Sequence, residues 1–307
     1  MKKVKRFLFP VSVSFIVGII LTASFFYWQH LNNQQSDIYE TIAEFDQLKI
    51  AKEQAKQLVT AAFLSSSTLD VNDLKNLSPK IYHVNFGILM YHHINYKAKI
   101  LSVRPEILDA QIKYLLEQGY KFVKLSDAFK TFSLTSSTPY DKTLVLTFDD
   151  GYRDFYLNAY PILKKYNVPA GLYVINQDIG RPGNVSWEML QILHQEGLIE
   201  IGVHTVNHLP LGRLKPEVAY YQMAKSKELL ERGLHDRIDT IVYPFGNFNE
   251  NVKKQAKQIG FIGAASVYFG DRPNGQDLYA WRRVMITNSD VGVLLLRKLF
   301  VAFKLAK

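Results

Sequence analysis

The run Thr143-Leu-Val-Leu-Thr-Phe-Asp-Asp-Gly151 places two acidic residues and a glycine directly after a stretch of apolar and β-branched residues. This composition predicts a buried β-strand over Thr143–Phe148, with Asp149 and Asp150 at its carboxyl end. Neighbouring residues of an extended chain point to opposite sides, so one carboxylate can bind a metal ion while the other acts as a base. A turn that uses Asp and Gly only for their backbone preferences is the alternative interpretation.

Similar short β-rich runs recur along residues 79–291. They are Gly87–His92, Lys121–Leu125, Gly171–Ile175, Ile199–His204, Thr240–Phe245, Ile262–Val267 and Trp281–Ile286. Helical patterns lie between many of them, at Pro105–Gln118, Phe155–Tyr166, Trp187–Glu196, Lys215–Arg232 and Asn249–Ile259. This alternation predicts an α/β fold around a parallel sheet, and the number of units predicts a distorted (β/α) barrel of seven or eight strands. In such a barrel the reactive side chains gather at the carboxyl ends of the strands.

Histidines stand at two more of the expected strand ends. His204-Thr-Val-Asn-His208 closes the fifth strand, and His92 ends the first. Two imidazoles and one carboxylate leave a fourth position open to water, which is the pattern of catalytic zinc sites. The alternative is that these are ordinary hydrogen-bonded histidines. The sixth strand ends in Tyr243-Pro-Phe-Gly246, which by itself indicates only a turn.

The composition narrows the class of protein. The chain has 307 residues, of which 48% are hydrophobic, so a disordered or fibrous protein is excluded. It contains no Cys, which excludes disulfides, thiol nucleophiles and thiolate metal sites, so any metal must be bound by His and carboxylates. Much of the net charge of +9 lies at the two ends of the chain, beside apolar residues. That pattern favours a membrane surface or an anionic wall polymer, and we find no nucleic-acid-binding motif.

The first 30 residues predict a membrane anchor. Phe7–Trp28 is a stretch of 22 residues without a charge, and it follows a basic cluster without acids. A helix of that length crosses the roughly 30 Å hydrocarbon core, and the basic cluster keeps the amino terminus in the cytoplasm. A cleaved signal peptide is the alternative, although Leu21-Thr-Ala23 matches a cleavage site poorly and Phe25–Trp28 continues the apolar stretch. The rest of the chain is then expected outside the cell.

Two further segments flank the expected barrel. Residues 31–78 form a predicted helical stalk, because Asp37–Phe63 has few breakers and helical apolar spacing. We interpret it as a spacer; a coiled-coil dimerisation arm needs a longer apolar repeat. Residues 292–307 form a basic amphipathic tail, which either lies on the membrane or packs on the barrel as a final helix.

Taken together, the motifs resemble those of the polysaccharide deacetylases of the NodB-homology type, carbohydrate esterase family 4, over about residues 85–290. The first family motif is matched by Thr147–Gly151, and the resemblance implies that Asp149 is the catalytic base and Asp150 a metal ligand. The second motif, His-Ser/Thr-x-x-His-Pro, is matched from His204 to His208, except that Leu209 precedes the proline. The resemblance therefore implies that both histidines are metal ligands.

Two family features are missing from their usual places. The Pro-aromatic-Gly turn at residues 244–246 implies that the Phe245 N–H contacts the oxyanion, but no Arg precedes it, and no His follows His235. One branch, the poly-β-1,6-N-acetylglucosamine deacetylases, has a circularly permuted motif order with an early Tyr-His strand and a late Arg strand. This similarity implies His92 as the acid and Arg283 as the cation that orients the base, with Arg282 as the alternative. Alternation places the two arginines on opposite faces.

The resemblance implies a metal-dependent N-deacetylase that removes acetyl groups from N-acetylglucosamine units of an extracellular polysaccharide. Zn²⁺ is the expected ion, with Co²⁺ or Ni²⁺ as substitutes. The branch favours poly-β-1,6-N-acetylglucosamine, and peptidoglycan is the main alternative substrate. A catalytically weak, membrane-anchored glycan-binding scaffold is the alternative of another class. The expected location is the bacterial cell membrane, with a single-pass anchor and an extracellular catalytic domain. Tyr152, Trp187 and Trp281 are aromatic residues that could stack on sugars or simply pack in the barrel.

Overall fold

The described part of the chain in this computed structural model comprises residues 84–97, 100–135, 141–267 and 277–304. The predicted anchor at Phe7–Trp28 and the predicted stalk at residues 31–78 lie outside these ranges. Within the described ranges, no helix has the length and apolar character of a membrane span.

In the described part of the chain, eight strands form one sheet in which every pairing is parallel. Their order is β10-β1-β5-β6-β7-β8-β9, and β4 pairs with β5 beside this path. The strands are β1 (Phe86–Tyr91), β4 (Lys121–Phe122), β5 (Thr143–Phe148), β6 (Ala170–Val174), β7 (Ile199–Val203), β8 (Thr240–Val242), β9 (Gly263–Ala265) and β10 (Val284–Met285). A separate small sheet pairs β2 (His93–Ile94) with β3 (Ser102–Val103). The predicted strand over Thr143–Phe148 is confirmed.

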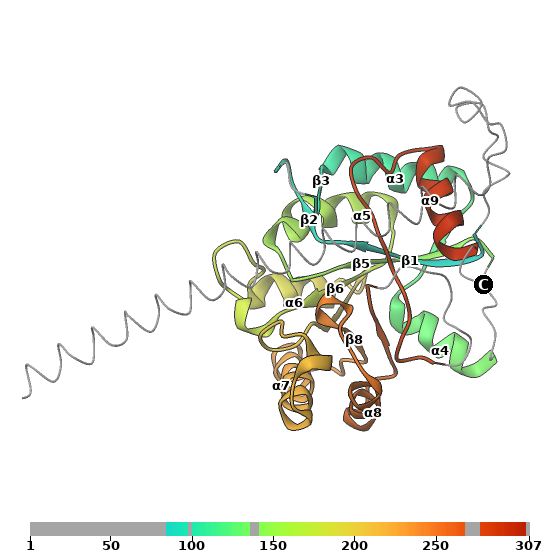
Figure 1. Cartoon of the computed structure of the whole chain (residues 1–307). Coiled ribbons are helices and arrows are strands. Elements are labelled where there is room, and N and C mark those ends of the chain that lie inside the picture. The colour runs from blue at the N-terminus through green and yellow to red at the C-terminus, as the bar shows by residue number, and fades with distance from the viewer. Residues whose placement is uncertain (1–83, 98–99, 136–140, 268–276, 305–307) are drawn as a thin grey trace, which may run out of the picture. The chain divides into compact units, whose positions relative to one another are not determined.

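Helices follow most strands, as expected for parallel connections. They are α3 (Pro105–Glu117), α4 (Leu125–Thr135), α5 (Tyr160–Tyr166), α6 (Trp187–Gln195), α7 (Pro216–Leu234), α8 (Glu250–Ile259) and α9 (Val293–Lys304). Proline at the first position starts α3 and α7, and the side chains of Ser186 and Asn249 cap α6 and α8. In Figure 1, α3, α5 and α9 lie on one side of the strands and α7 and α8 on the other.

The sheet curls into an incomplete barrel. Inner-face side chains of β1 and β9, which are far apart in the strand order, pack in one buried cluster with Trp281. Trp281 forms an isolated parallel bridge with Ala265 of β9, and β10 pairs with β1 a few residues later. The segment that contains β10 therefore contacts both edges of the sheet. The α/β class and the parallel, barrel-like sheet are confirmed, and among the described residues β9 and β10 themselves are not paired.

Helix α4 fills the inner side of the curled sheet. Its Phe129 and Phe132 rings pack against Trp281 at centroid distances of 4.2 and 5.6 Å. Gly263 of β9 allows this approach, because a Cβ there would lie 2.5 Å from the Phe129 ring. The sequence-based strand over Lys121–Leu125 is too long, since β4 ends at Phe122 and α4 begins at Leu125.

The carboxyl-terminal helix α9 packs on the barrel, which is one of the two interpretations of residues 292–307. Leu295, Leu299 and Phe303 are buried in the main core. Gly87 of β1 makes room for this helix, because a Cβ there would lie 2.4 Å from the Phe303 ring.

Candidate metal and catalytic site

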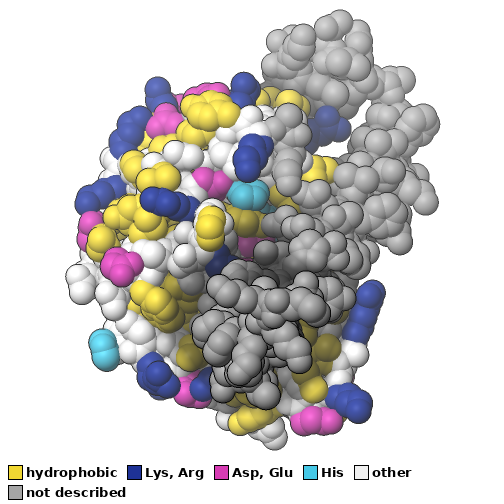
Figure 2. All heavy atoms as spheres, turned by 90° about the vertical axis from the view of Figure 1, so that its left-hand side faces the viewer, with side chains coloured by type: hydrophobic (Ala, Val, Ile, Leu, Met, Phe, Trp, Pro, Cys, Tyr) yellow, Lys and Arg dark blue, Asp and Glu magenta, His cyan; other side chains and the backbone are white. Residues whose placement is uncertain are grey.

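The register of the strands brings the expected site residues to one edge of the sheet. Tyr91 is level with Phe148, and Val174 is level with Val203. His92, Asp149 and His204 each follow directly after a strand at this level. Figure 2 views the face at which these strands end. An exposed histidine side chain lies there beside hydrophobic side chains, and Lys and Arg side chains are distributed over the rest of the face.

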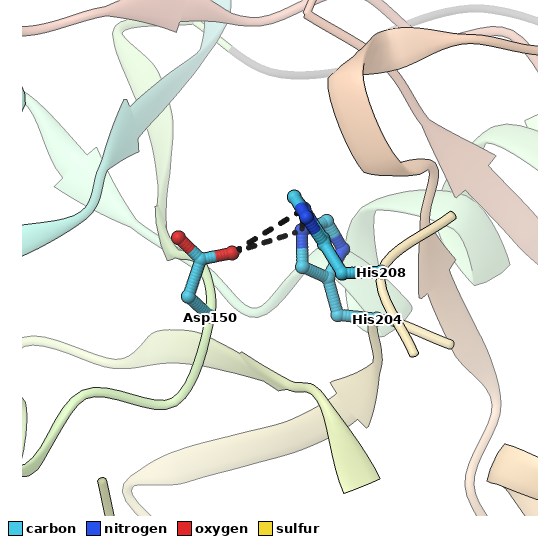
Figure 3. Close-up of side chains that lie close together, drawn as sticks. All are labelled: Asp150, His204 and His208. Atoms are coloured by element: carbon cyan, nitrogen blue, oxygen red, sulfur yellow. Dashed lines mark hydrogen bonds and ion pairs between the residues drawn. The ribbon is translucent and has the colours of Figure 1, made fainter. Parts of the chain in front are cut away.

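Asp150, His204 and His208 point toward one another at this edge (Figure 3). Asp150 Oδ1 lies 3.3 Å from His204 Nε2 and 3.5 Å from His208 Nε2, and the two Nε2 atoms are 3.1 Å apart. An ion with tetrahedral bonds of about 2.0–2.1 Å holds its ligand atoms about 3.3–3.4 Å apart. Asp150 Oδ1 is also buried without a hydrogen-bond partner in the described part of the chain. The three side chains therefore fit a divalent metal ion such as Zn²⁺.

The backbone at the ligands adopts an unusual conformation. Asp150, Thr205 and His208 have φ values of +70°, +69° and +57°, in the left-handed region that non-glycine residues rarely adopt. The turn is closed by the Thr205 hydroxyl oxygen, which accepts a hydrogen bond from the His208 N–H at 3.0 Å. Such strain persists where the surrounding structure imposes it, and it clusters at functional sites.

Gly151 is required directly after the ligand Asp150. Its φ is +73°, and a Cβ there would lie 2.9 Å from Val174 Cγ1. The close packing of this turn on β6 explains why glycine ends the acidic motif, and it fixes the position of the Asp150 carboxylate.

The tautomer of His204 suits metal binding. Its Nδ1 lies 2.8 Å from the carbonyl oxygen of Val242, which can only accept, so Nδ1 carries the proton and Nε2 is free to act as a ligand. Burial lowers the pKa of His208 to about 4, so its imidazole is neutral at pH 7. Burial would also lower the pKa of His204, but the Asp150 carboxylate outweighs it and raises that pKa. The cluster thus accommodates positive charge beside Asp150, and a metal ion can supply it.

Asp149 is held by a buried arginine on the closing segment. Arg283 Nη1 and Nη2 each donate to one Asp149 carboxylate oxygen at 2.7 Å. Arg283 also donates to Thr147 Oγ1 and to the Ser266 carbonyl oxygen, each at 3.0 Å. Burial would raise the pKa of Asp149, but the charge and hydrogen bonds of Arg283 outweigh it, so this pKa lies below its usual range. Asp149 is therefore ionised at neutral pH.

The structure distinguishes the two candidate arginines. The side chain of Arg283 is fully buried, whereas Arg282 is exposed. Of the two, Arg283 is the one that reaches Asp149. The hydrogen bond from Arg283 to the Ser266 carbonyl oxygen could not be predicted from sequence, because every residue has such an oxygen. Thr147 belongs to the first family motif, but nothing in the sequence indicated that its hydroxyl accepts a hydrogen bond from Arg283.

His92 lies beside the metal cluster, as its place in the register predicts. Its side chain is buried, and burial lowers its pKa despite the opposing charges of Asp150 and Asp149. This direction favours the neutral imidazole, whereas the sequence-based expectation of an acid requires the protonated form.

The Phe245 turn lies against the second histidine ligand. The Phe245 ring centroid is 4.5 Å from that of His208, and the Phe245 φ is +56°. Gly246, at φ +59°, is packed so tightly that a Cβ would lie 2.5 Å from Val267 Cγ2. The turn is thus rigid next to the ligands. Of the three aromatic residues considered for sugar stacking, Trp281 is buried in the inner cluster and Trp187 packs against Gly233.

Comparisons with known proteins agree with this site. A family model described as "Polysaccharide deacetylase" matches residues 136–264. The Bacillus subtilis (strain 168) protein named "Putative polysaccharide deacetylase YxkH" is 35% identical over 201 residues, which cover 65% of this chain and 71% of that protein. The chain therefore belongs to the polysaccharide deacetylase family, and the relatives that follow are named as deacetylases.

Other relatives extend the comparison. The Staphylococcus aureus (strain MSSA476) protein named "Poly-beta-1,6-N-acetyl-D-glucosamine N-deacetylase" is 27% identical over 263 residues, which cover 73% of this chain and 89% of that protein. The structure of the Streptococcus pyogenes deacetylase PplD in complex with acetate superposes with a TM-score of 0.66 at 29% identity, covering 71% of this chain and 99% of that one. IcaB from Ammonifex degensii shares the fold, with a TM-score of 0.63 at 23% identity over 70% and 97% of the two chains.

Proposed function

We propose that this chain is a metal-dependent N-deacetylase that acts on N-acetylglucosamine units of an extracellular polysaccharide. The observation that carries the proposal is the arrangement of Asp150, His204 and His208 at tetrahedral ligand spacings directly beside a buried, ionised Asp149. Carboxylate and imidazole ligands suit Zn²⁺, and Co²⁺ or Ni²⁺ accept the same donors.

A divalent ion bound by these three residues would polarise the acetamide carbonyl and lower the pKa of a bound water molecule. Asp149 is the residue placed to take the proton from the attacking water. Arg283 occupies both Asp149 oxygens with one hydrogen bond each, which fixes the carboxylate plane and leaves a lone pair on each oxygen for this proton. The Phe245 N–H is proposed to donate to the oxyanion, where a fixed donor stabilises the developing charge.

Hydrolysis of the amide requires one proton on the departing nitrogen. Water adds its oxygen to the carbonyl carbon, the C–N bond breaks, and the amine leaves once it is protonated. His92 is the proposed donor, because it lies beside Asp149 at the end of the neighbouring strand. Its lowered pKa implies that the free enzyme holds this proton mainly at mildly acidic pH.

For the substrate we propose poly-β-1,6-N-acetylglucosamine. Support comes from the Staphylococcus aureus relative of that name and from the order of the site residues, with His92 before the acidic motif and Arg283 near the end. Peptidoglycan is the alternative substrate. The glycan-binding scaffold is less well supported, because such a protein does not need a buried base beside metal ligands.

For the domain organisation we propose a basic end and single-pass anchor at residues 1–30, a stalk at 31–78, the deacetylase domain at 79–291 and a carboxyl-terminal segment at 292–307. The uncharged stretch Phe7–Trp28 and its preceding basic cluster support an extracellular enzyme at the bacterial membrane.

Amine release from β-1,6-linked N-acetylglucosamine oligomers and from peptidoglycan, measured side by side with the zinc-loaded chain, tests this proposal. We expect release from the β-1,6 oligomers, and its loss in Asp149→Asn. Release from peptidoglycan alone would overturn the substrate and keep the chemistry. Absence of both release and bound metal would contradict the enzyme proposal and favour the scaffold.

A further inference from the structure

A second histidine–carboxylate pair, His93 and Asp154, stands close along the chain to His92 and Asp150 and has no part in the mechanism above. Asp154 accepts three hydrogen bonds from consecutive residues of the segment that starts with β2. They come from His93 Nδ1 at 2.7 Å, the Ile94 N–H at 3.1 Å and Asn95 Nδ2 at 2.7 Å. A carboxylate used in this way fixes both the path of the segment and the orientation of the His93 ring.

The His93 ring stacks on Tyr152. The two ring centroids are 3.5 Å apart, and the planes are inclined by only 18°. The backbone of Tyr152 forms an antiparallel bridge with Asn184, which fixes the position of the tyrosine backbone. The His93 side chain is 19% exposed and that of Tyr152 is partly exposed. The pair is therefore a rigid aromatic surface that solvent can reach.

The stacked pair lies at the same edge of the sheet as the proposed reaction site. His93 follows His92, and Tyr152 is two residues beyond Asp150. At 3.3–3.6 Å per extended residue, the Cα atoms of Tyr152 and Asp150 are at most about 7 Å apart. A polymer whose acetamide reaches the metal ligands can therefore place a neighbouring sugar unit on the pair.

The chemistry of the pair suits a sugar. The Asp154 carboxylate accepts at His93 Nδ1, so the tautomer with the proton on Nδ1 leaves Nε2 as an acceptor. Sugar hydroxyl and acetamide N–H groups are donors that match this atom. Aromatic rings with little conformational freedom also supply binding surface at low entropic cost, as they do in other binding sites.

We propose that His93 and Tyr152, held by Asp154, form a binding subsite for the pyranose unit next to the one that is deacetylated. The apolar C–H face of that unit lies on the aromatic pair, and a hydroxyl or N–H group donates to His93 Nε2. This inference rests on the proposed function and adds a residue-level account of how the enzyme holds a polymer. Asp154 acts through His93 and is a positioning residue.

The test compares KM and kcat of the full zinc-loaded chain on β-1,6-linked N-acetylglucosamine dimers and pentamers. Loss of one stacking interaction is worth roughly five- to tenfold or more in binding, by analogy with the aromatic stacking of flat ligand rings. We expect Tyr152→Leu to raise KM for the pentamer by that factor, to change kcat much less, and to reduce the preference for the pentamer over the dimer. Tyr152→Phe retains the ring and should restore the preference, and Asp154→Asn should weaken it.

Tyr221→Leu is the matched control, because this α7 tyrosine is 55% exposed and belongs to none of the clusters described above. It should retain the wild-type preference. A drop in kcat for Tyr152→Leu with unchanged pentamer preference would overturn the subsite and indicate a merely structural role. Zinc content and melting temperature of each variant show whether the fold is retained.

Binding of the fully deacetylated β-1,6-glucosamine pentamer, measured by titration calorimetry, separates this proposal from the proposed function. Equal affinities of wild type and Tyr152→Leu would overturn the subsite whatever the activity assay gives. Tyr152-dependent pentamer binding by a chain that deacetylates no glycan would support the subsite and contradict the enzyme.

Discussion

Replacement of Arg283 by methionine tests the account of the buried ion pair. Arg283 is fully buried, Asp149 is 2% exposed, and the variant removes both charged hydrogen bonds to that carboxylate. Removal of one partner of a buried pair costs about 3–5 kcal/mol, because it leaves an uncompensated charge. For a domain of this size each kcal/mol lowers the melting temperature by roughly 2–4 °C, so we expect a drop of roughly 6–20 °C at pH 7.

The pH dependence of this loss has a definite sign. In the wild type the pKa of Asp149 is lowered, so its stabilisation is present above the unfolded-state pKa and is lost as pH falls through the folded-state value. Without Arg283, the largest opposition to burial is gone, only the weaker charges of His204 and His92 remain, and the Asp149 pKa rises. The ionised form then destabilises the fold, increasingly as pH rises above the unfolded-state pKa of about 3.9. The difference between wild type and Arg283→Met should therefore be larger at pH 7.5 than at pH 4.5.

Urea unfolding followed by tryptophan fluorescence, in the presence of a chelator, measures this difference without the contribution of bound metal. The exposed neighbour Arg282 provides the matched control, and Arg282→Met should cost less than about 1 kcal/mol. In a double-mutant cycle, Asp149→Asn combined with Arg283→Met should recover part of the loss, with a coupling of roughly 2–3 kcal/mol. A cost below about 1 kcal/mol for Arg283→Met, or a coupling near zero, would refute the reasoning.

Three more changes test other parts of the account. Leu299→Ala should lower the free energy of unfolding by about 2–5 kcal/mol, because this side chain is buried in the main core. Leu294→Ala, at an exposed position of the same helix, is the control and should lower it much less. Small and equal effects of the two substitutions would contradict the packing of α9. Gly151→Ala should cost about 1–3 kcal/mol and weaken zinc binding, since the new Cβ meets Val174 at a positive φ; unaltered stability and zinc affinity would argue against a fixed turn. His92→Gln should lower kcat/KM by about 10²–10⁴ with zinc retained. Because the His92 pKa is lowered, the wild-type kcat/KM should decline with rising pH already below 6.5, and a decline only at alkaline pH would exclude His92 as the acid.

Much of the fold could be predicted from local patterns. The continuous apolar run Thr143–Phe148 has the bounds of β5, and the proline at residue 105 marks the first residue of α3. Helix α4 was not predicted, although Leu125, Ala128, Phe129 and Phe132 have helical spacing. The expected strand Lys121–Leu125 extended into the first residue of this helix. Short apolar segments do not distinguish a strand from a helix by period alone.

The site could be predicted where the reactive residues stand at strand ends, since parallel strands bring those ends together. The alternation of side chains along a strand could not show which of Arg282 and Arg283 faces inward. That depends on how the segment with Trp281 and β10 contacts both edges of the sheet. The contact between His93 and Asp154 spans 61 residues and depends on the paths of two loops. Neither loop has a periodic pattern from which such a contact could be predicted.

The central claim is that Asp150 binds the metal while Asp149 acts on water, and zinc content and deacetylation measured on the same preparations test it most directly. We expect one zinc per wild-type chain, loss of activity with a chelator and recovery with Zn²⁺. Asp149→Asn should retain zinc but lose activity, whereas Asp150→Asn should lose both. Full activity of the chelated wild type, or zinc binding and activity retained by Asp150→Asn, would contradict the account.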